Sequence, residues 1–276
     1  IYYNIKDKYY NLIDKKSLIY EEVKSQYIYI VIQWHSCHSN YFHWLTEILP
    51  KFYLLGFITN WRLPKNIRFV TVGYRLKKFQ YESLCLLFSL SKIDIIHYSR
   101  SVKFEKSLVI HPPSPGWLAT SFLKEMSNHL ISNISESKLN NPPYKSNKPL
   151  FIKRGETRNF RDFDIDSKKY INELIYSGSI DPFDPGLYTF TEQIAQFYNS
   201  NSIFGIHGAA FANLIFSQSK NRTIEFSSLN YPDIPTYYLS GISNIKWSNI
   251  LLSLDQYGFY KLNGNCINTI MEYFKN

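Results

Sequence analysis

The chain has 276 residues, enough for one large domain or for two domains of about 100–150 residues each. Hydrophobic residues make up 45% of the sequence and charged residues 19%, which excludes a disordered or collagen-like chain. The 31 Lys and Arg residues outnumber the 22 Asp and Glu residues. The resulting formal charge of +9 favours an anionic partner: nucleic acid, a membrane surface or a phosphorylated small molecule.

Indirect signs favour a cytoplasmic protein. Its three cysteines, Cys37, Cys85 and Cys266, are widely spaced and odd in number, as expected of free thiols in a reducing compartment. No run approaches the about 18–20 apolar residues of a membrane span, so any membrane association is expected to be peripheral. The abundance of Asn, Ile, Lys and Tyr favours a microbial or viral source. The chain starts at Ile1 and not at Met, which is compatible with a removed leader. If such a leader was removed from a eukaryotic protein, the expected location is instead the Golgi or ER lumen.

Apolar periodicity predicts alternating strands and helices in an N-terminal domain at residues 1–140. In chain order we expect a strand at 27–33, a helix at about 40–55, a strand at 67–72, a helix at about 77–90, strands at 93–97 and 107–110, and a helix at about 117–132.

Residues 141–149 are predicted to be a linker, because apolar periodicity is lost and three prolines occur between residues 135 and 149. A C-terminal domain at 150–276 is then expected to contain a strand at 150–153, helices at about 168–176 and 191–198, a strand at 202–206, a helix at about 208–216, a strand at 223–226 and a helix near 266–274. The alternation indicates two α/β units with parallel sheets. A ligand between them would lie at the carboxyl ends of the strands.

The most informative segment is 202–216, where a buried strand passes through a tight turn straight into a helix of small and apolar residues. The turn is His207-Gly208-Ala209-Ala210. Small side chains let the backbone approach a ligand closely, and the amides at a helix N-terminus suit a phosphate group. A close-packed strand–helix crossing without a ligand is the alternative.

Basic and acidic side chains follow two other predicted strands. Arg154, Arg158 and Arg161 come after the strand at 150–153, and guanidinium groups match pyrophosphate oxygens. A solvated basic loop would have the same composition. Glu225 ends the strand at 223–226, where a carboxylate commonly accepts hydrogen bonds from ribose hydroxyls, although this position alone decides nothing.

In the first half, Asn40, His43 and Glu47 share one stripe of the helix at 40–55. A His and a carboxylate one turn apart can share a proton, so either one could act as a general base toward a substrate hydroxyl. The alternative is an N-capping Asn followed by a structural His–Glu pair.

Metal sites are weakly supported. The spacing of four residues near the start of that helix matches none of the usual zinc patterns: His35, Cys37, His38 and His43. Asp162 and Asp164 could hold a divalent cation, but acids that cap the next helix are the simpler interpretation. The sequence has no Walker loop, nucleophile elbow or dinucleotide-binding glycine motif.

These segments, in this order, resemble glycosyltransferase family 61, whose members build capsular polysaccharide and xylan and add N-acetylglucosamine to proteins. The resemblance is carried by residues 40–50, the stretch from Arg154 to Arg158, residues 191–195, and residues 205–216 leading into 223–225. Two positions differ from the family pattern: Asn159-Phe160 separates Arg158 from Arg161, and Ser219-Lys220-Asn221-Arg222 replaces a Pro-Gly turn.

The resemblance implies a GT-B fold of two facing Rossmann-like domains and a nucleotide-sugar donor held mainly by the C-terminal one. It implies no metal and no other cofactor. The donor-binding residues are then expected to be Arg154, Arg158, His207, Gly208, Ala209, Ala210, Asn213 and Glu225. On the acceptor side the resemblance indicates Asn40 and Trp44.

We therefore expect an inverting, metal-independent glycosyltransferase that moves xylose or N-acetylglucosamine from a UDP-sugar to a glycan hydroxyl, with no nucleic-acid partner. Glu47 is expected to be the base and His43 its partner, because inversion requires a base on the face opposite the leaving phosphate. Two alternatives stay open: a non-catalytic module that binds glycan or nucleic acid, and a metal-dependent transferase that uses Asp162 and Asp164.

Overall fold

Strands of the N-terminal half pair in parallel in the computed structural model. Four of them form a sheet in the order β4-β3-β2-β6, and β1 pairs separately with β5. The strands are β1 (Glu21–Val23), β2 (Ile28–Val31), β3 (Ile67–Val72), β4 (Ile95–Tyr98), β5 (Val102–Phe104) and β6 (Ser107–Leu108). The structure describes residues 21–23, 26–32, 40–99, 102–108, 110, 120–145, 147–154, 162–228 and 235–275.

The C-terminal half contains a second sheet of five parallel strands in the order β11-β10-β9-β7-β8. Its strands are β7 (Leu150–Ile152), β8 (Asp181–Phe183), β9 (Ser202–Ile206), β10 (Arg222–Ser227) and β11 (Lys246–Leu251). The order reverses between β7 and β9, because the chain runs from β7 outward to β8 and then returns to the other side of β7. Such a reversal is the topological switch point of a doubly wound sheet.

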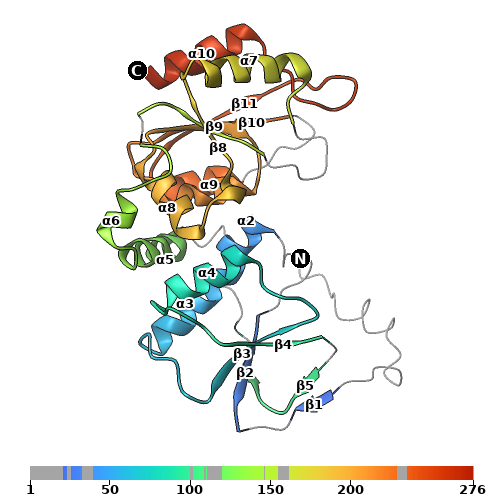
Figure 1. Cartoon of the computed structure of the whole chain (residues 1–276), viewed down its shortest axis with the longest axis vertical. Helices are drawn as coiled ribbons and strands as arrows, with labels where there is room; N and C mark the ends of the chain where they lie inside the picture. The colour runs from blue at the N-terminus through green and yellow to red at the C-terminus, as the bar shows by residue number, and fades with distance from the viewer. Residues whose placement is uncertain are drawn as a thin grey trace.

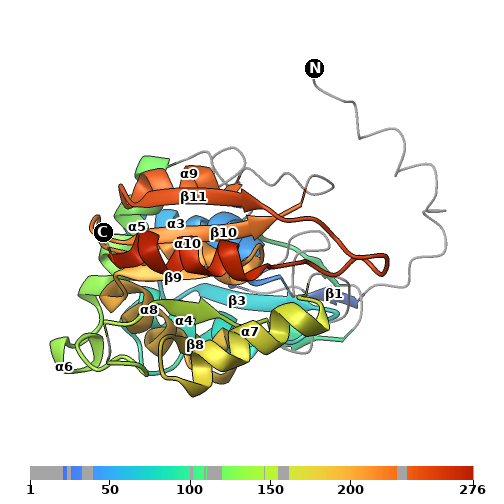
Figure 2. The same cartoon turned by 90° about the horizontal axis from the view of Figure 1, so that it is seen from above.

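Helices cover both faces of the C-terminal sheet. On the outer face, α7 (Ile165–Tyr176) and α10 (Gly264–Lys275) bury Ile171, Ile267 and Ile270 against Phe204 and Phe226 of the sheet (Figures 1 and 2). The inner face is covered by three elements: α8 (Phe190–Asn199), the 3-10 helix η4 (Ala209–Phe216) and α9 (Pro235–Ile242). With both faces covered, the central strand β9 is buried along its whole length.

The inner helices pack against helices from the first half. These are α2 (Tyr41–His43), the π-helix η1 (Trp44–Ile48), α3 (Leu49–Ile58), α4 (Lys78–Leu87), α5 (Thr120–Ser132) and α6 (Glu136–Leu139). One continuous hydrophobic core runs from Ile30 of β2 through this helical layer to Ile203 of β9. The Ser127 hydroxyl of α5 also donates to the Ile215 carbonyl of η4 at 2.7 Å. The layer therefore joins the two sheets, as Figure 1 shows.

The segment at 141–149 is attached to the C-terminal half in its described part. Its Tyr144 packs against Phe183 of β8, and the Tyr144 amide donates to Gln196 Oε1 of α8 at 2.8 Å. Burial raises the pKa of Tyr144 to about 12, and the neighbouring Tyr188 adds to the rise. The division into domains at this segment stays a prediction.

The predicted α/β class with parallel sheets is confirmed, and β3 and β9 have the predicted bounds. The helix predicted at 40–55 is composed of α2, η1 and α3, and the one at 208–216 is a 3-10 helix. Short or polar elements were missed: β1, β5, β8, β11, α6, α9 and the 3-10 helix η3 (Pro185–Leu187). Parts of three predicted elements fall outside the described residues: Gln33, Val109 and 117–119.

The part of the chain that the structure describes contains no helix long and apolar enough to cross a bilayer. Cys85 and Cys266 are free thiols, as predicted, whereas Cys37 lies outside the described residues.

Gly205 is required for the close approach of β9 and β7. A Cβ atom at this position would lie 2.9 Å from the Ile152 carbonyl oxygen and 3.1 Å from Ile152 Cβ. We expect Gly205→Ala to lower the free energy of unfolding by about 1–3 kcal/mol, because the strands must move apart. In Gly241→Ala, the control, the added Cβ meets no atom within 4 Å. Urea unfolding measures both variants, and a Gly205→Ala protein as stable as the control would contradict this reason for the glycine.

Candidate functional site

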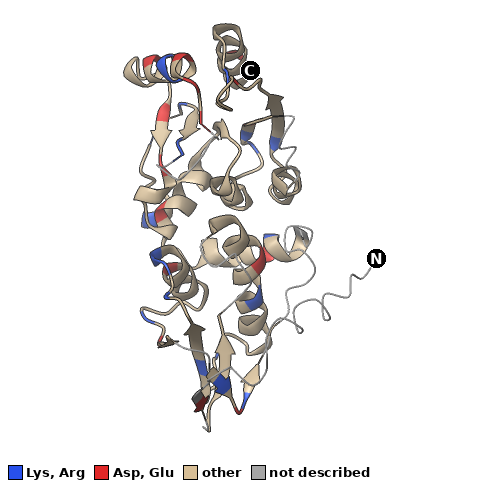
Figure 3. Ribbon diagram, turned by 90° about the vertical axis from the view of Figure 1, so that its right-hand side faces the viewer, with Lys and Arg blue, Asp and Glu red and all other residues tan. Residues whose placement is uncertain are grey.

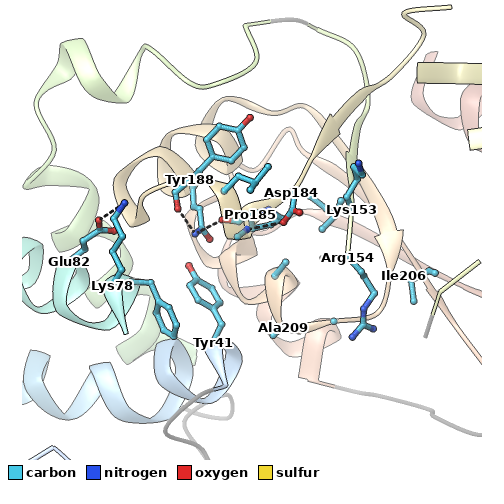
Figure 4. A pocket seen from close by; sticks show the side chains of 17 residues that line it. Tyr41, Lys78, Glu82, Lys153, Arg154, Asp184, Pro185, Tyr188, Ile206 and Ala209 are labelled. Atoms are coloured by element: carbon cyan, nitrogen blue, oxygen red, sulfur yellow. Dashed lines mark hydrogen bonds and ion pairs between the residues drawn. The ribbon is translucent and has the colours of Figure 1, made fainter. Parts of the chain in front are cut away.

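A cavity of about 420 Å³ lies between the two halves. Its walls come from α2 and α4 on one side and from the carboxyl ends of β7, β8 and β9 on the other: Tyr41, Lys78, Phe79, Glu82, Ile152, Lys153, Arg154, Asp184, Pro185, Gly186, Leu187, Tyr188, Gln193, Ile206, Gly208, Ala209 and Ala210. Figure 4 shows Lys78 and Glu82 at one end of the cavity and Arg154 at the other. This location matches the switch point between β7 and β9, where open α/β sheets bind their ligands.

The turn after β9 provides the floor of the cavity at the Arg154 end. Gly208, Ala209 and Ala210 line it, and η4 begins at Ala209, so the first amides of a 3-10 helix lie at this wall. Arg154 Nη1 donates to the backbone carbonyl of His207 at 2.7 Å, which ties the end of β7 to the turn. A guanidinium has five N–H donors, so it can hold a carbonyl and a phosphate group together.

His207 is not among the lining residues, and its side chain binds a fully buried carboxylate. Its Nδ1 donates to Glu225 Oε1 at 2.5 Å. Glu225 also accepts from the Thr236 hydroxyl at 3.0 Å and from Trp247 Nε1 at 3.1 Å. The contact between Glu225 and ribose hydroxyls stays a prediction; here donors from α9, β11 and the turn surround the carboxylate, which has no exposed surface. Glu225 thereby fixes the imidazole ring.

Asn213 was predicted to bind the donor, but it lies in the core. Its Oδ1 accepts from the Tyr41 hydroxyl of α2 at 2.6 Å, and its Nδ2 donates to Gln193 Oε1 of α8 at 3.2 Å. Burial raises the pKa of Tyr41 far above its usual value, outweighing the hydrogen bond to Asn213, which lowers it. The phenol therefore stays protonated and acts as a donor. Asn213 connects the two walls of the cavity and is not part of its surface.

At the start of the helical segment at 40–58, the structure confirms the alternative in which Asn40 is an N-cap. Asn40 caps α2, since its side chain accepts from the amide of Phe42 at 2.9 Å. Trp44 is completely buried and donates to the Ser83 hydroxyl of α4 at 2.8 Å. The acceptor contact of Trp44 stays a prediction; here its ring is part of the core and joins η1 to α4.

His43 and Glu47 form the predicted pair. His43 Nδ1 and Glu47 Oε1 are 2.7 Å apart, and both side chains keep some exposed surface. Glu47 belongs to the π-helix η1, a wide helical turn that often marks a functional position. Burial lowers the pKa of Lys51, one turn further on, and the Glu47 carboxylate acts in the opposite direction. The pair does not line the cavity, but Tyr41, two residues before His43, does.

The two aspartates considered as cation ligands have structural partners. Asp164 caps α7 by accepting from the Ser167 amide at 2.8 Å, and Asp162 pairs with Lys168 at 2.6 Å. Among the described residues, no group of three His, Cys, Asp or Glu side chains is placed to hold a metal ion. Arg158 and Arg161 lie outside the described residues, as do His35 and His38.

Sequence reasoning missed most of the wall that faces Arg154. Glu82 and Lys78 of α4 pair at 3.7 Å, and Glu82 Oε2 accepts from the amide of Phe190, so α4 caps α8 of the other half. Gln193 donates to the carbonyls of Pro185 and Tyr188 and thereby holds the loop before α8. The positions of these residues depend on contacts between halves, for which the sequence carries no local signal.

Replacing Glu225 tests the hydrogen bonds that hold the turn after β9, which we call the brace. In Glu225→Gln the amide NH2 group cannot accept a hydrogen bond, so one buried donor among His207, Thr236 and Trp247 loses its partner. We expect the free energy of unfolding to fall by about 2–4 kcal/mol, measured by urea titration. Glu173→Gln on the exposed face of α7 is the matched control. Equal stability of the two variants would contradict the brace.

One comparison with known proteins assigns the chain to a family. No curated protein matches it significantly. The family model described as Glycosyltransferase 61 matches residues 41–224, from the start of α2 to the middle of β10, which is more than half of the chain and includes both walls of the cavity. The chain belongs to glycosyltransferase family 61.

Proposed function

We propose that the protein is an inverting, metal-independent glycosyltransferase that uses a UDP-sugar donor. The observation that carries this proposal is the cavity at the switch point, where Arg154 and the turn Gly208-Ala209-Ala210 share one wall. A diphosphate at that wall would meet a guanidinium and the amides at the start of η4. Such preorganised donors stabilise the charge that develops on a departing nucleoside diphosphate, a task that a bound cation performs in other transferases.

The roles of the predicted donor residues follow from their burial. Arg154 and the turn would contact the diphosphate directly, and Arg158 joins them on the family resemblance alone. His207 and Glu225 would act behind the turn, because their hydrogen bond fixes the direction of its amides. Lys153 extends from β7 in the direction opposite to Arg154 (Figure 4), so we assign it no phosphate contact.

The acceptor would be a glycan hydroxyl in a cell-surface polysaccharide or a glycoprotein glycan. The transferred sugar would be xylose or N-acetylglucosamine. We also propose the GT-B arrangement, with residues 1–140 and 150–276 as its two domains. The separation of the two parallel sheets into the two halves supports this arrangement. The proposed location of the protein is the cytoplasm.

In the proposed reaction, the acceptor oxygen attacks the anomeric carbon while the bond from that carbon to the phosphate oxygen breaks. The bonding electrons leave with UDP, and the hydroxyl proton passes to a base. We assign the base to Glu47 with His43 as its partner. Their 2.7 Å hydrogen bond, their partial exposure and the π-helix at Glu47 support this assignment. Glu82 lines the cavity, but its carboxylate already caps α8.

A panel of UDP-sugars, assayed for UDP release with and without EDTA, tests the function. We expect turnover of one pentose or N-acetylhexosamine donor and no loss of rate with EDTA. Loss of rate that Mn²⁺ restores would contradict metal independence and favour the cation alternative at Asp162 and Asp164. No affinity for any UDP-sugar, together with salt-dependent binding of a random oligonucleotide, would contradict the transferase proposal itself.

Removal of the proposed base should affect the transfer rate but not UDP binding. Glu47→Gln and His43→Ala should lower the transfer rate by about 10²–10⁴ and leave UDP binding unchanged, because neither side chain contacts the donor wall. Transfer is measured by product formation and UDP binding by calorimetry. The control is again Glu173→Gln. Near wild-type transfer by both variants would show that the base lies elsewhere in the N-terminal half.

A further inference from the structure

A second concave surface lies beside the cavity, on the N-terminal half. We call it the basic groove; its charged and titratable lining residues are Arg75, Lys77, Lys78, Tyr81, Lys92, Asp94 and His97. It has a volume of about 540 Å³ and runs between the first turn of α4 and β4, the edge strand of the sheet among the described residues. The donor wall of the C-terminal half contributes none of its lining.

The groove carries a surplus of positive charge. Its lining has four Lys and Arg side chains against one carboxylate, Asp94, which pairs with Lys92 at 3.5 Å. His97 lies at its floor, where its Nδ1 is 3.1 Å from the Thr71 hydroxyl. Lys and Arg are spread over both halves (Figure 3), so positive charge alone does not mark a site. The distinguishing feature is that these cations line a hollow.

Two lysines of the groove lie at the N-terminus of α4. Lys77 is the N-cap residue of α4 and Lys78 is its first residue, whereas a helix N-terminus favours negative charge. The first turn of α4 contains no acidic residue. Lys78 pairs with Glu82 one turn later, and an anion bound in the groove would interact favourably with both lysines and with the helix dipole.

The groove and the donor cavity share one lining residue. Lys78 lines both hollows, and its partner Glu82 lines the cavity one turn further along α4. A ligand in the groove and a donor in the cavity would thus both lie beside Lys78. A chain that fills the groove and extends past Lys78 would place its next unit in the cavity, which Tyr41 also lines.

We propose that the acceptor is an acidic glycan whose carboxylate or phosphate group binds Arg75, Lys77 and Lys92 in the basic groove. This inference rests on the proposed transferase function and adds the chemical class of its acceptor. The anionic group anchors one residue of the glycan, and the adjoining residue presents its hydroxyl to the donor. Uronate and phosphate groups share the chemistry that these cations recognise.

The test compares three acceptors of equal length: a neutral oligosaccharide, its uronate-containing counterpart and its phosphorylated counterpart. We expect at least one acidic acceptor to have a KM about tenfold below that of the neutral one, and this advantage to shrink as NaCl is raised. The triple variant Arg75→Gln/Lys77→Gln/Lys92→Gln should remove the advantage without changing the KM of the donor. Comparison of the two acidic acceptors shows which anion is preferred.

The control is Lys169→Gln/Lys220→Gln/Lys246→Gln, which removes the same charge from exposed positions of the C-terminal half. It should keep the preference for acidic acceptors. Equal KM values for all three acceptors, or equal effects of the two triple variants, would overturn the inference. So would groove-dependent binding of a random oligonucleotide without binding of acidic glycans.

Calorimetry of each oligosaccharide with donor-free protein separates this inference from the function on which it rests. Binding of an acidic oligosaccharide that the groove variant loses and the control keeps would support the groove even if no UDP-sugar is turned over. Donor turnover without any preference for acidic acceptors would leave the transferase function standing and reject the groove.

Discussion

The buried carboxylate of Glu225 is the constraint on which the geometry of the donor wall depends. A carboxylate without exposed surface must be fully hydrogen-bonded, and its donors come from three places in the chain: His207 after β9, Thr236 of α9 and Trp247 of β11. Meeting this requirement fixes the imidazole ring. The contact between Arg154 and the His207 carbonyl then fixes the backbone from the other side. These two contacts, His207 with Glu225 and Arg154 with the His207 carbonyl, orient the backbone amides of the turn in the absence of a ligand.

The other wall of the cavity depends on contacts between the halves. Tyr41, Asn213 and Gln193 form a chain of hydrogen bonds from α2 through η4 to α8, which ends on carbonyls of the loop before α8. Glu82 of α4 caps the same helix, α8. Because these groups are buried or partly buried, a relative shift of the halves would leave polar atoms without partners. The shape of the cavity is therefore coupled to the packing of the helical layer.

Patterns along the chain were sufficient for the fold class and for local contacts, but not for distant ones. Periodicity located β3 and β9, and capping rules explained Asn40 and Asp164. The burial of Asn213 and Glu225 was not predicted, because a polar residue in a strand or helix carries no mark of burial in its own segment. Their partners, Tyr41 and Trp247, lie 172 and 22 residues away. The edge strands β8 and β11 were missed since they are short or polar, with Pro182 inside β8.

Helix α4 sets the spacing between the two proposed binding surfaces. Its first residue, Lys78, lies at the junction of the basic groove and the cavity, and Glu82 one turn later lines the cavity and caps α8. Ser83, the next residue, accepts from Trp44 and so fixes α4 to the π-helix that carries Glu47. One helix thus contacts the groove, the cavity and the π-helix that carries the proposed base, while Arg75 and Lys92 of the groove lie in loops. Rigid elements hold reacting groups within the small tolerances that an in-line displacement requires.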